Sequence, residues 1–221
     1  MEELKAVLER VEEKLIAAEK IYAAMQFQVW VVVMVFYYII IGPLETIPWQ
    51  LTAVYWTLAF VVFAYFTRMI WERLVKLHLS AGKKMESSSV FGLSIALSWV
   101  SGFIVGWIAM PKYLSGMFES PVVLGIGYLI FISWAVFGMF LAFWHFGKSL
   151  EREMIPAFLI PAVAIPLIPK VAKAAMVYAG FVVAFAFGLT VLSYIYSAFK
   201  TLGWSHGTKG TGEKPCAWKS H

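Results

Sequence analysis

The chain has 221 residues, of which 61% are apolar and only 14% are charged. Soluble domains carry roughly 45–50% apolar and about 25% charged residues, so this composition excludes an ordinary soluble globular protein. The net charge of +5 does not indicate a nucleic-acid partner, because the Lys and Arg residues flank apolar runs and follow membrane topology instead.

Long runs without a charged residue dominate the chain. A helix needs about 20 apolar residues to cross a bilayer core, and five of the six runs exceed that length. Strands of a membrane barrel alternate apolar and polar residues, which these runs do not. The sequence therefore predicts an all-α integral membrane protein with up to six transmembrane helices. The runs are 21–44, 46–67, 87–111, 120–147, 154–169 and 174–199.

Residues 1–25 come before the first run and have a different pattern. Apolar residues recur there at alternating spacings of four and three, as in the seam of a coiled coil, and Glu, Lys and Arg fill most other positions. Six acids against four bases disfavour a helix lying on anionic lipid. We interpret 1–25 as an amphipathic cytoplasmic helix that contacts a partner, a symmetry mate or this chain's own loops. The seam is Leu4, Leu8, Val11, Leu15, Ala18, Tyr22 and Met25.

The middle of the chain, within a transmembrane domain predicted over 26–200, has readable helix boundaries. The second helix is expected to continue past its apolar run and to stop at Gly82. Ser120 followed by Pro121 is typical of the first two positions of a helix and predicts the start of the fourth span.

The fifth run, 154–169, is short and rich in proline. Its 16 residues make about 24 Å of helix, and proline inside a helix removes a hydrogen bond. It is either a thin, kinked span or a re-entrant segment. Interrupted helices can form transport sites, so Pro156, Pro161 and Pro166, together with Glu45 at the end of the first run, are candidate transport residues.

The distribution of bases favours six spans. With both ends inside, 15 of the 18 Lys and Arg residues lie on the cytoplasmic side, whereas a re-entrant fifth segment reduces the number to 13. The sequence therefore predicts a plasma-membrane protein with cytoplasmic N- and C-termini. Residues 201–221 are expected to form a flexible basic tail.

Small residues repeat every fourth position in two of the spans. Such stripes allow helix backbones to approach closely in a membrane. They predict contacts within the chain, between these two helices for example, or an interface with another subunit. The stripes are Ser94, Ser98, Gly102 and Gly106 in the third span, and Gly180, Ala184 and Gly188 in the sixth.

Residues for chemistry are scarce. The chain has no Asp and no Asn, and no motif for a cofactor, a metal or a catalytic nucleophile stands out. His206, Cys216 and His221 could share a metal, but three ligands in a flexible tail are weak evidence for a site. The sequence therefore predicts no metal or cofactor site. The lack of Asn also fits a thermophilic source.

Three functions remain open at this point. The first is a non-catalytic structural or accessory subunit of a membrane complex, or a homo-oligomer, with the lipid bilayer and other membrane subunits as partners. The second is a small transporter or channel that uses the fifth segment. The third, a membrane-embedded enzyme, ranks last because no acid–base constellation is present.

Overall fold

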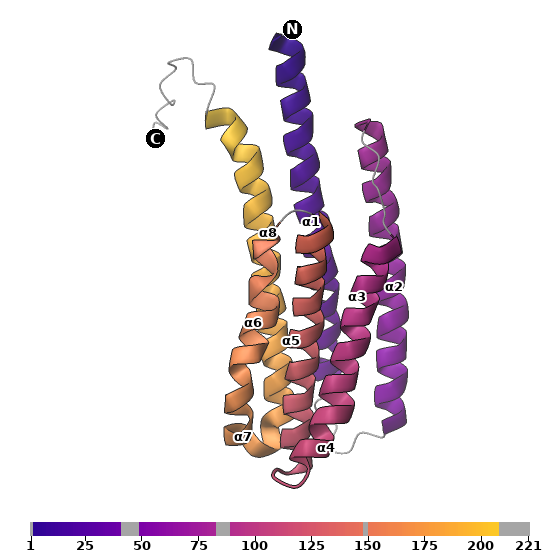
Figure 1. Cartoon of the computed structure of the whole chain (residues 1–221), viewed down its shortest axis with the longest axis vertical. Coiled ribbons are helices and arrows are strands. Elements are labelled where there is room, and N and C mark those ends of the chain that lie inside the picture. Colours follow the sequence, from indigo (N-terminus) through magenta and orange to yellow (C-terminus); the bar gives the residue numbers. More distant parts are fainter. Residues whose placement is uncertain (1, 41–48, 83–88, 148–149, 208–221) are drawn as a thin grey trace, which may run out of the picture.

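The computed structural model describes residues 2–40, 49–82, 89–147 and 150–207, and these are helical throughout apart from short turns (Figure 1). No strand occurs within these ranges. The main helices are α1 (Glu2–Ile40), α2 (Trp49–Ser80), α3 (Ser89–Phe103), α4 (Met110–Leu114), α5 (Ser120–Gly147), α6 (Ile155–Ala164), α7 (Ile168–Val171) and α8 (Ala175–Gly207). Shorter elements join them: the π-helix η1 (Ile104–Ala109) and the 3-10 turns η2 (Arg152–Met154), η3 (Ile165–Leu167) and η4 (Ala172–Ala174).

In the part of the chain that the structure describes, five helical stretches are long and apolar enough to cross a membrane. The fifth of these, 152–203, combines the Pro-rich segment with α8 in 52 residues. The prediction of a helical membrane bundle therefore agrees with the structure at the level of five long apolar helices. These stretches are 7–40, 50–80, 90–114, 120–146 and 152–203.

Two helix boundaries follow the sequence closely. The start predicted at Ser120 is confirmed, because α5 begins there. The stop predicted at Gly82 is confirmed as well: α2 ends at Ser80, and Gly82 has a φ of +73°, which residues with a side chain rarely adopt.

At the N-terminus, the amphipathic segment and the first apolar run form one continuous helix, α1. At the other end, α8 continues to Gly207, so residues 201–207 of the expected tail are helical.

The Pro-rich segment is helical and folds back on α8. Pro161 lies inside α6, and Pro166 lies in the 3-10 turn η3, where the helix tightens because proline offers no backbone N–H. The chain then reverses at Ala172, which has a positive φ of 41°. As a result α6 and α8 lie side by side and run in opposite directions (Figure 1).

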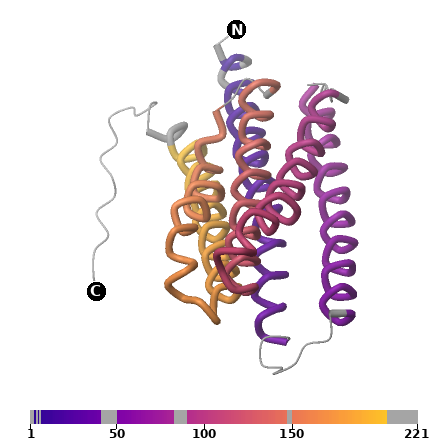
Figure 2. Tube along the Cα trace, turned by 60° about the horizontal axis from the view of Figure 1, so that its bottom comes forward, coloured from indigo at the N-terminus to yellow at the C-terminus, as the bar shows by residue number. Residues whose placement is uncertain are grey.

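The helices pack around α5 and α8. The most extensive contacts are those of α1 with α8 and of α3 with α5, and α6 packs against both α5 and α8. α2 stands at the edge of the bundle and packs mainly on α1 (Figure 2). The beginning of α1 and the end of α8 lie at the same end of the bundle, and the first turns of α1 extend beyond its neighbours (Figure 1).

The inner face of α8 combines small residues with two large aromatic ones, Phe187 and Tyr194. Ala175, Ala179 and Ala186 are fully buried, whereas bulky residues such as Phe181 and Phe185 point outward and are exposed. The buried alanines allow neighbouring backbones to approach closely, as is common between helices that pack in lipid.

Candidate functional site

The most concentrated polar site joins α1, α8 and the turn before α6. Lys20 of α1 places its Nζ 2.8 Å from a Glu151 carboxylate oxygen and 3.3 Å from one of Glu153. The three side chains are only 14–18% exposed. The Lys20 ammonium also lies 5.5 Å from the centre of the Tyr194 ring on α8, within the range of a cation–π contact.

Two hydroxyls of α8 complete this site. The Tyr194 hydroxyl lies beside Glu151 and the Ser197 hydroxyl lies beside Glu153. Each carboxylate thus faces one ammonium and one hydroxyl in a half-buried setting, where paired charges are stabilised by hydrogen bonds to their remaining oxygens. We call these five residues the Lys20 cluster. It fastens three segments together at the end of the bundle where α1 begins.

Lys20 itself belongs to a stripe of side chains on α1 that faces α8. Ala17 and Ala24 are buried on this stripe, and Phe27 lies against Phe187 and Tyr194 with ring centroids 5.3 and 6.1 Å apart. The spacing Ala17–Lys20–Ala24–Phe27 is three, four and three residues, which keeps these side chains on one face of the helix. Sequence analysis missed this stripe because Lys20 interrupts its apolar pattern.

The predicted coiled-coil seam occupies a different face of α1. Leu8 is 60% exposed, Val11 42% and Met25 39%, whereas Leu15 is buried and Ala18 and Tyr22 are half-buried. The side chain of Leu4 lies outside the described parts. All described side chains from Glu3 to Glu12 are exposed, so the first turns of α1 carry an uncovered apolar stripe.

The small-residue stripe of the third span lies against α5. A Cβ added to Gly102 would come within 3.1 Å of the Phe131 carbonyl oxygen, and Ser98 occupies the space beside Gly138. Ser94 is half-buried, and its hydroxyl donates to the Val90 carbonyl within its own helix.

The closest approach of two backbones is at Gly106. This residue faces Gly127 of α5, and a Cβ at either position would overlap the other's carbonyl oxygen. Gly106 lies in the π-helix η1. Pro111, in the first turn of the following helix α4, has no backbone N–H to donate to a hydrogen bond. A π turn is wider than an α turn, and π segments are rare and mostly short interruptions of α-helices.

The small-residue stripe of the sixth span does not meet the stripe of the third. Gly180 lies beneath the Tyr38 ring of α1, whose hydroxyl donates to the Met176 carbonyl oxygen at 3.1 Å. Ala184 is half-buried, and no atom lies within 4 Å of a Cβ placed on Gly188. Gly180 is buried, and so are Ala179 and Val183, which lie one position before Gly180 and Ala184.

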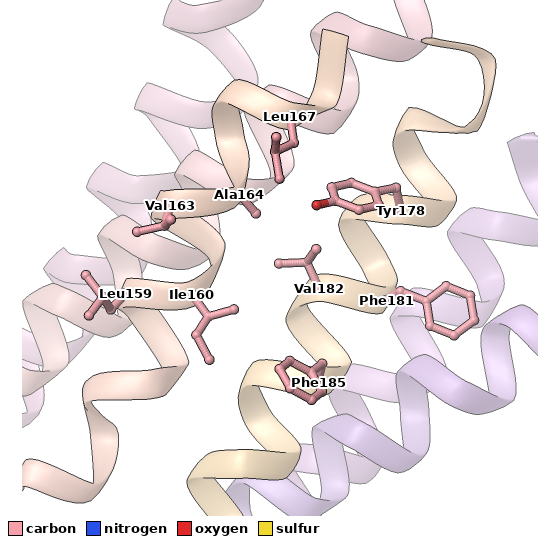
Figure 3. A pocket seen from close by; sticks show the side chains of 9 residues that line it. All are labelled: Leu159, Ile160, Val163, Ala164, Leu167, Tyr178, Phe181, Val182 and Phe185. Atoms are coloured by element: carbon pink, nitrogen blue, oxygen red, sulfur yellow. The ribbon is translucent and has the colours of Figure 1, made fainter. Parts of the chain in front are cut away.

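The Pro-rich segment, which contains three of the four candidate transport residues, borders an apolar hollow. A cavity of about 560 Å³ opens between the Pro-rich segment and α8, and Tyr178 supplies the one hydroxyl among its lining side chains (Figure 3). Pro161 is buried next to it, Pro156 is half-buried and Pro166 is exposed. Glu45 lies outside the described residues. The remaining lining residues are Leu159, Ile160, Val163, Ala164, Leu167, Phe181, Val182 and Phe185.

Within the described ranges, no three His, Cys, Asp or Glu residues are placed to hold a metal ion. The side chain of His206 and the whole of Cys216 and His221 lie outside those ranges.

Comparisons with known proteins give no relative for this chain. No protein-family model matches it, and neither a curated protein nor a solved structure does. Function therefore has to be argued from the chain's own residues.

Proposed function

We propose that this chain is a non-catalytic multi-pass membrane protein that acts as a structural or accessory subunit of a membrane complex, or as a homo-oligomer. The observation that carries the proposal is the uncovered stripe on α1. The bundle uses the Ala17–Phe27 stripe to bind α8, which leaves Leu8 and Val11 exposed on a helix that extends past its neighbours. Coiled-coil seams of this kind need a second helix to bury them.

Six crossings of the plasma membrane, with both ends cytoplasmic, are part of this proposal. The Pro-rich segment and α8 run in opposite directions, so each can count as a crossing, with the fifth short and kinked at its prolines. The beginning of α1 and the end of α8 share one end of the bundle, and 15 of the 18 bases fall on that side if all six segments cross.

The outer surface supports contact with lipid and with other helices. Bulky apolar side chains face outward along α2 and α8, for example Val61 at 61% and Leu192 at 62% exposed. The charged side chains lie outside the long uncharged runs of the sequence. This arrangement favours a protein whose helices are held to one another, and to partner subunits, by packing of apolar side chains.

Transport by the fifth segment is the alternative. It requires polar groups along a path beside Pro161 and Pro166, and the hollow at that place is lined by apolar side chains. The subunit hypothesis needs no such path and is therefore preferred.

Purification in a mild detergent, followed by mass measurement and identification of co-purifying proteins, tests the proposal. The wild type should form a particle well above the 24.9 kDa of one chain. Replacing Leu8 and Val11 together by Glu should reduce it, because two charges would then lie in the interface. The matched control is Glu9→Gln on the opposite side of the helix, which should leave the particle intact. A wild-type protein that is a clean monomer would overturn the proposal.

A further inference from the structure

The hollow between the Pro-rich segment and α8 is a groove on the outer side of the bundle. Its rims are bulky and exposed, for example Val163 at 68% and Phe185 at 61%, whereas Ala164 is only 7% exposed. Ile160 points into the groove from α6, and Val182 points into it from α8 (Figure 3). Both segments belong to a stretch that is apolar enough to cross a membrane, so in a bilayer the groove opens to lipid.

Water does not suit a groove of this chemistry. A stable enclosed water needs two to four polar partners, and the lining offers one side-chain hydroxyl, that of Tyr178. The volume of about 560 Å³ is in the range of sites for small molecules. The groove therefore suits an apolar occupant.

The size of the groove favours a single lipid chain over a helix. Its lining on the Pro-rich side runs from Leu159 to Leu167, about 12 Å of helix, which is most of one leaflet of a core about 30 Å thick. A helix about 10 Å across would occupy about 900 Å³ over that length, more than the groove holds. One acyl chain that lies along the groove fits both its length and its volume.

Polar groups stand at one end of the groove. Leu167 and Tyr178 line that end, and the Tyr178 hydroxyl points toward the Pro-rich side (Figure 3). Lys170 of α7 follows Leu167 by three residues, and Lys173 lies in η4, just before α8. Both lysines are exposed, and in the described part of the chain neither has an ion-pair partner. This end of the groove thus offers two ammonium groups and one hydroxyl to an anion.

The charge at this end of the bundle is positive. α7 lies at the end opposite to the beginning of α1 (Figure 1). The described residues there include one further lysine, Lys112 of α4, and one acid, Glu119, which is exposed and comes just before α5. Phospholipid headgroups lie beside the ends of membrane helices, and basic clusters at that level bind anionic ones. The occupant that complements both the groove and its lysines is a lipid with a negative headgroup.

We propose that this groove binds one anionic phospholipid. An acyl chain lies between α6 and α8, and the headgroup phosphate accepts hydrogen bonds from Lys170, Lys173 and Tyr178, which are strong because the partners are charged. The inference requires that the bundle lies in a bilayer. It does not rest on the subunit hypothesis, so either can fail without the other.

The test is native mass spectrometry of the delipidated full chain in detergent, titrated with phosphatidylglycerol and with phosphatidylcholine that carry identical acyl chains. The wild type should bind one phosphatidylglycerol about 30-fold more tightly than phosphatidylcholine, which is the combined effect of two lysines near an anionic headgroup. Equal affinity for the two lipids would overturn the proposal.

Variants separate the contribution of the lysines from that of the groove. Replacing Lys170 and Lys173 together by Gln should abolish the preference for phosphatidylglycerol. Replacing Lys14 and Lys112 together by Gln is the matched control, because it removes the same charge at exposed positions on other helices and should leave the preference unchanged. Val182→Trp fills the groove and should weaken the binding of both lipids about tenfold or more, since each buried methylene group contributes to affinity. A preference that survives in the Lys170 and Lys173 variant would overturn the proposal.

A second measurement uses the wild type alone and so does not depend on how Val182→Trp folds. Phosphatidylglycerol with a photoreactive group in its acyl chain is added to the full chain in vesicles of phosphatidylcholine, and the labelled residues are identified by mass spectrometry. Labels should concentrate within 159–167 and 178–185. Labels spread evenly over the exposed apolar faces of α2 and α8 would refute a specific site, and their absence from both ranges would mean that a helix covers the groove instead.

Discussion

Gly106→Ala should destabilise the bundle, although alanine is the better helix former. The new Cβ would lie 2.7 Å from the Phe131 Cβ and 2.9 Å from the Phe131 backbone nitrogen, and it would overlap the Gly127 carbonyl oxygen. Backbone atoms cannot move aside cheaply, so η1 and α5 must separate. Overpacking of this kind costs about 1–3 kcal/mol, and the gain in helix propensity returns up to about 1 kcal/mol. We expect a net loss of about 1–2 kcal/mol.

Gly188→Ala is the matched control, because it is the same substitution in the other small-residue stripe. No atom lies within 4 Å of the added Cβ, so the variant should be neutral or more stable by up to about 1 kcal/mol. Reversible unfolding in mixed micelles, followed by circular dichroism, measures both. For a chain of this size the loss at Gly106 corresponds to a Tm lower by about 2–8 °C. A Gly106→Ala protein as stable as the wild type, or an equal loss in both variants, would refute the packing argument.

Further predictions concern the charged cluster, the contact of Tyr38 and the topology. Lys20→Met leaves two half-buried carboxylates without their cation and should lower the free energy of unfolding by about 2 kcal/mol, a value between those of surface and buried ion pairs. Arg68→Met breaks the exposed pair with Glu72 and should change the free energy of unfolding little. Equal effects of the two variants in the same unfolding assay would contradict this prediction. Tyr38→Phe removes the hydrogen bond to Met176 and should cost about 1 kcal/mol, whereas Tyr65→Phe at a 67% exposed site should cost nothing measurable. In intact cells, a membrane-impermeant thiol reagent should label Ser115→Cys, and should reach Cys216 only after permeabilisation; labelling of Cys216 from outside would mean that the fifth segment does not cross.

The positions of the helices could be predicted from the sequence because charges and helix-end residues mark them. Ser120 and Gly82 act through local backbone chemistry, which needs no knowledge of the neighbours. The lengths of the apolar stretches likewise follow from the cost of placing charges in lipid.

The packing faces could not be predicted in the same way. In α8 both the outward-facing and the buried side chains are mostly apolar, so hydrophobic periodicity does not distinguish the predicted Ala184, which is half-buried, from the buried Ala179 and Val183. The Lys20 cluster joins residues 131 positions apart, and nothing local to Lys20 or Glu151 indicates that they meet. A clue was present at Lys20, however: a charge at the edge of an apolar run needs either water or a partner.

The most direct test of the proposed assembly is photocrosslinking in cells with a photoreactive amino acid placed on α1. At Leu8 and at Val11, on the exposed stripe, it should produce a discrete heavier adduct, whose mass identifies either a second copy of this chain or another subunit. At Glu9, on the other side of the same helix, it should produce none. Adducts of equal yield at all three positions, or none at Leu8 and Val11, would contradict the account.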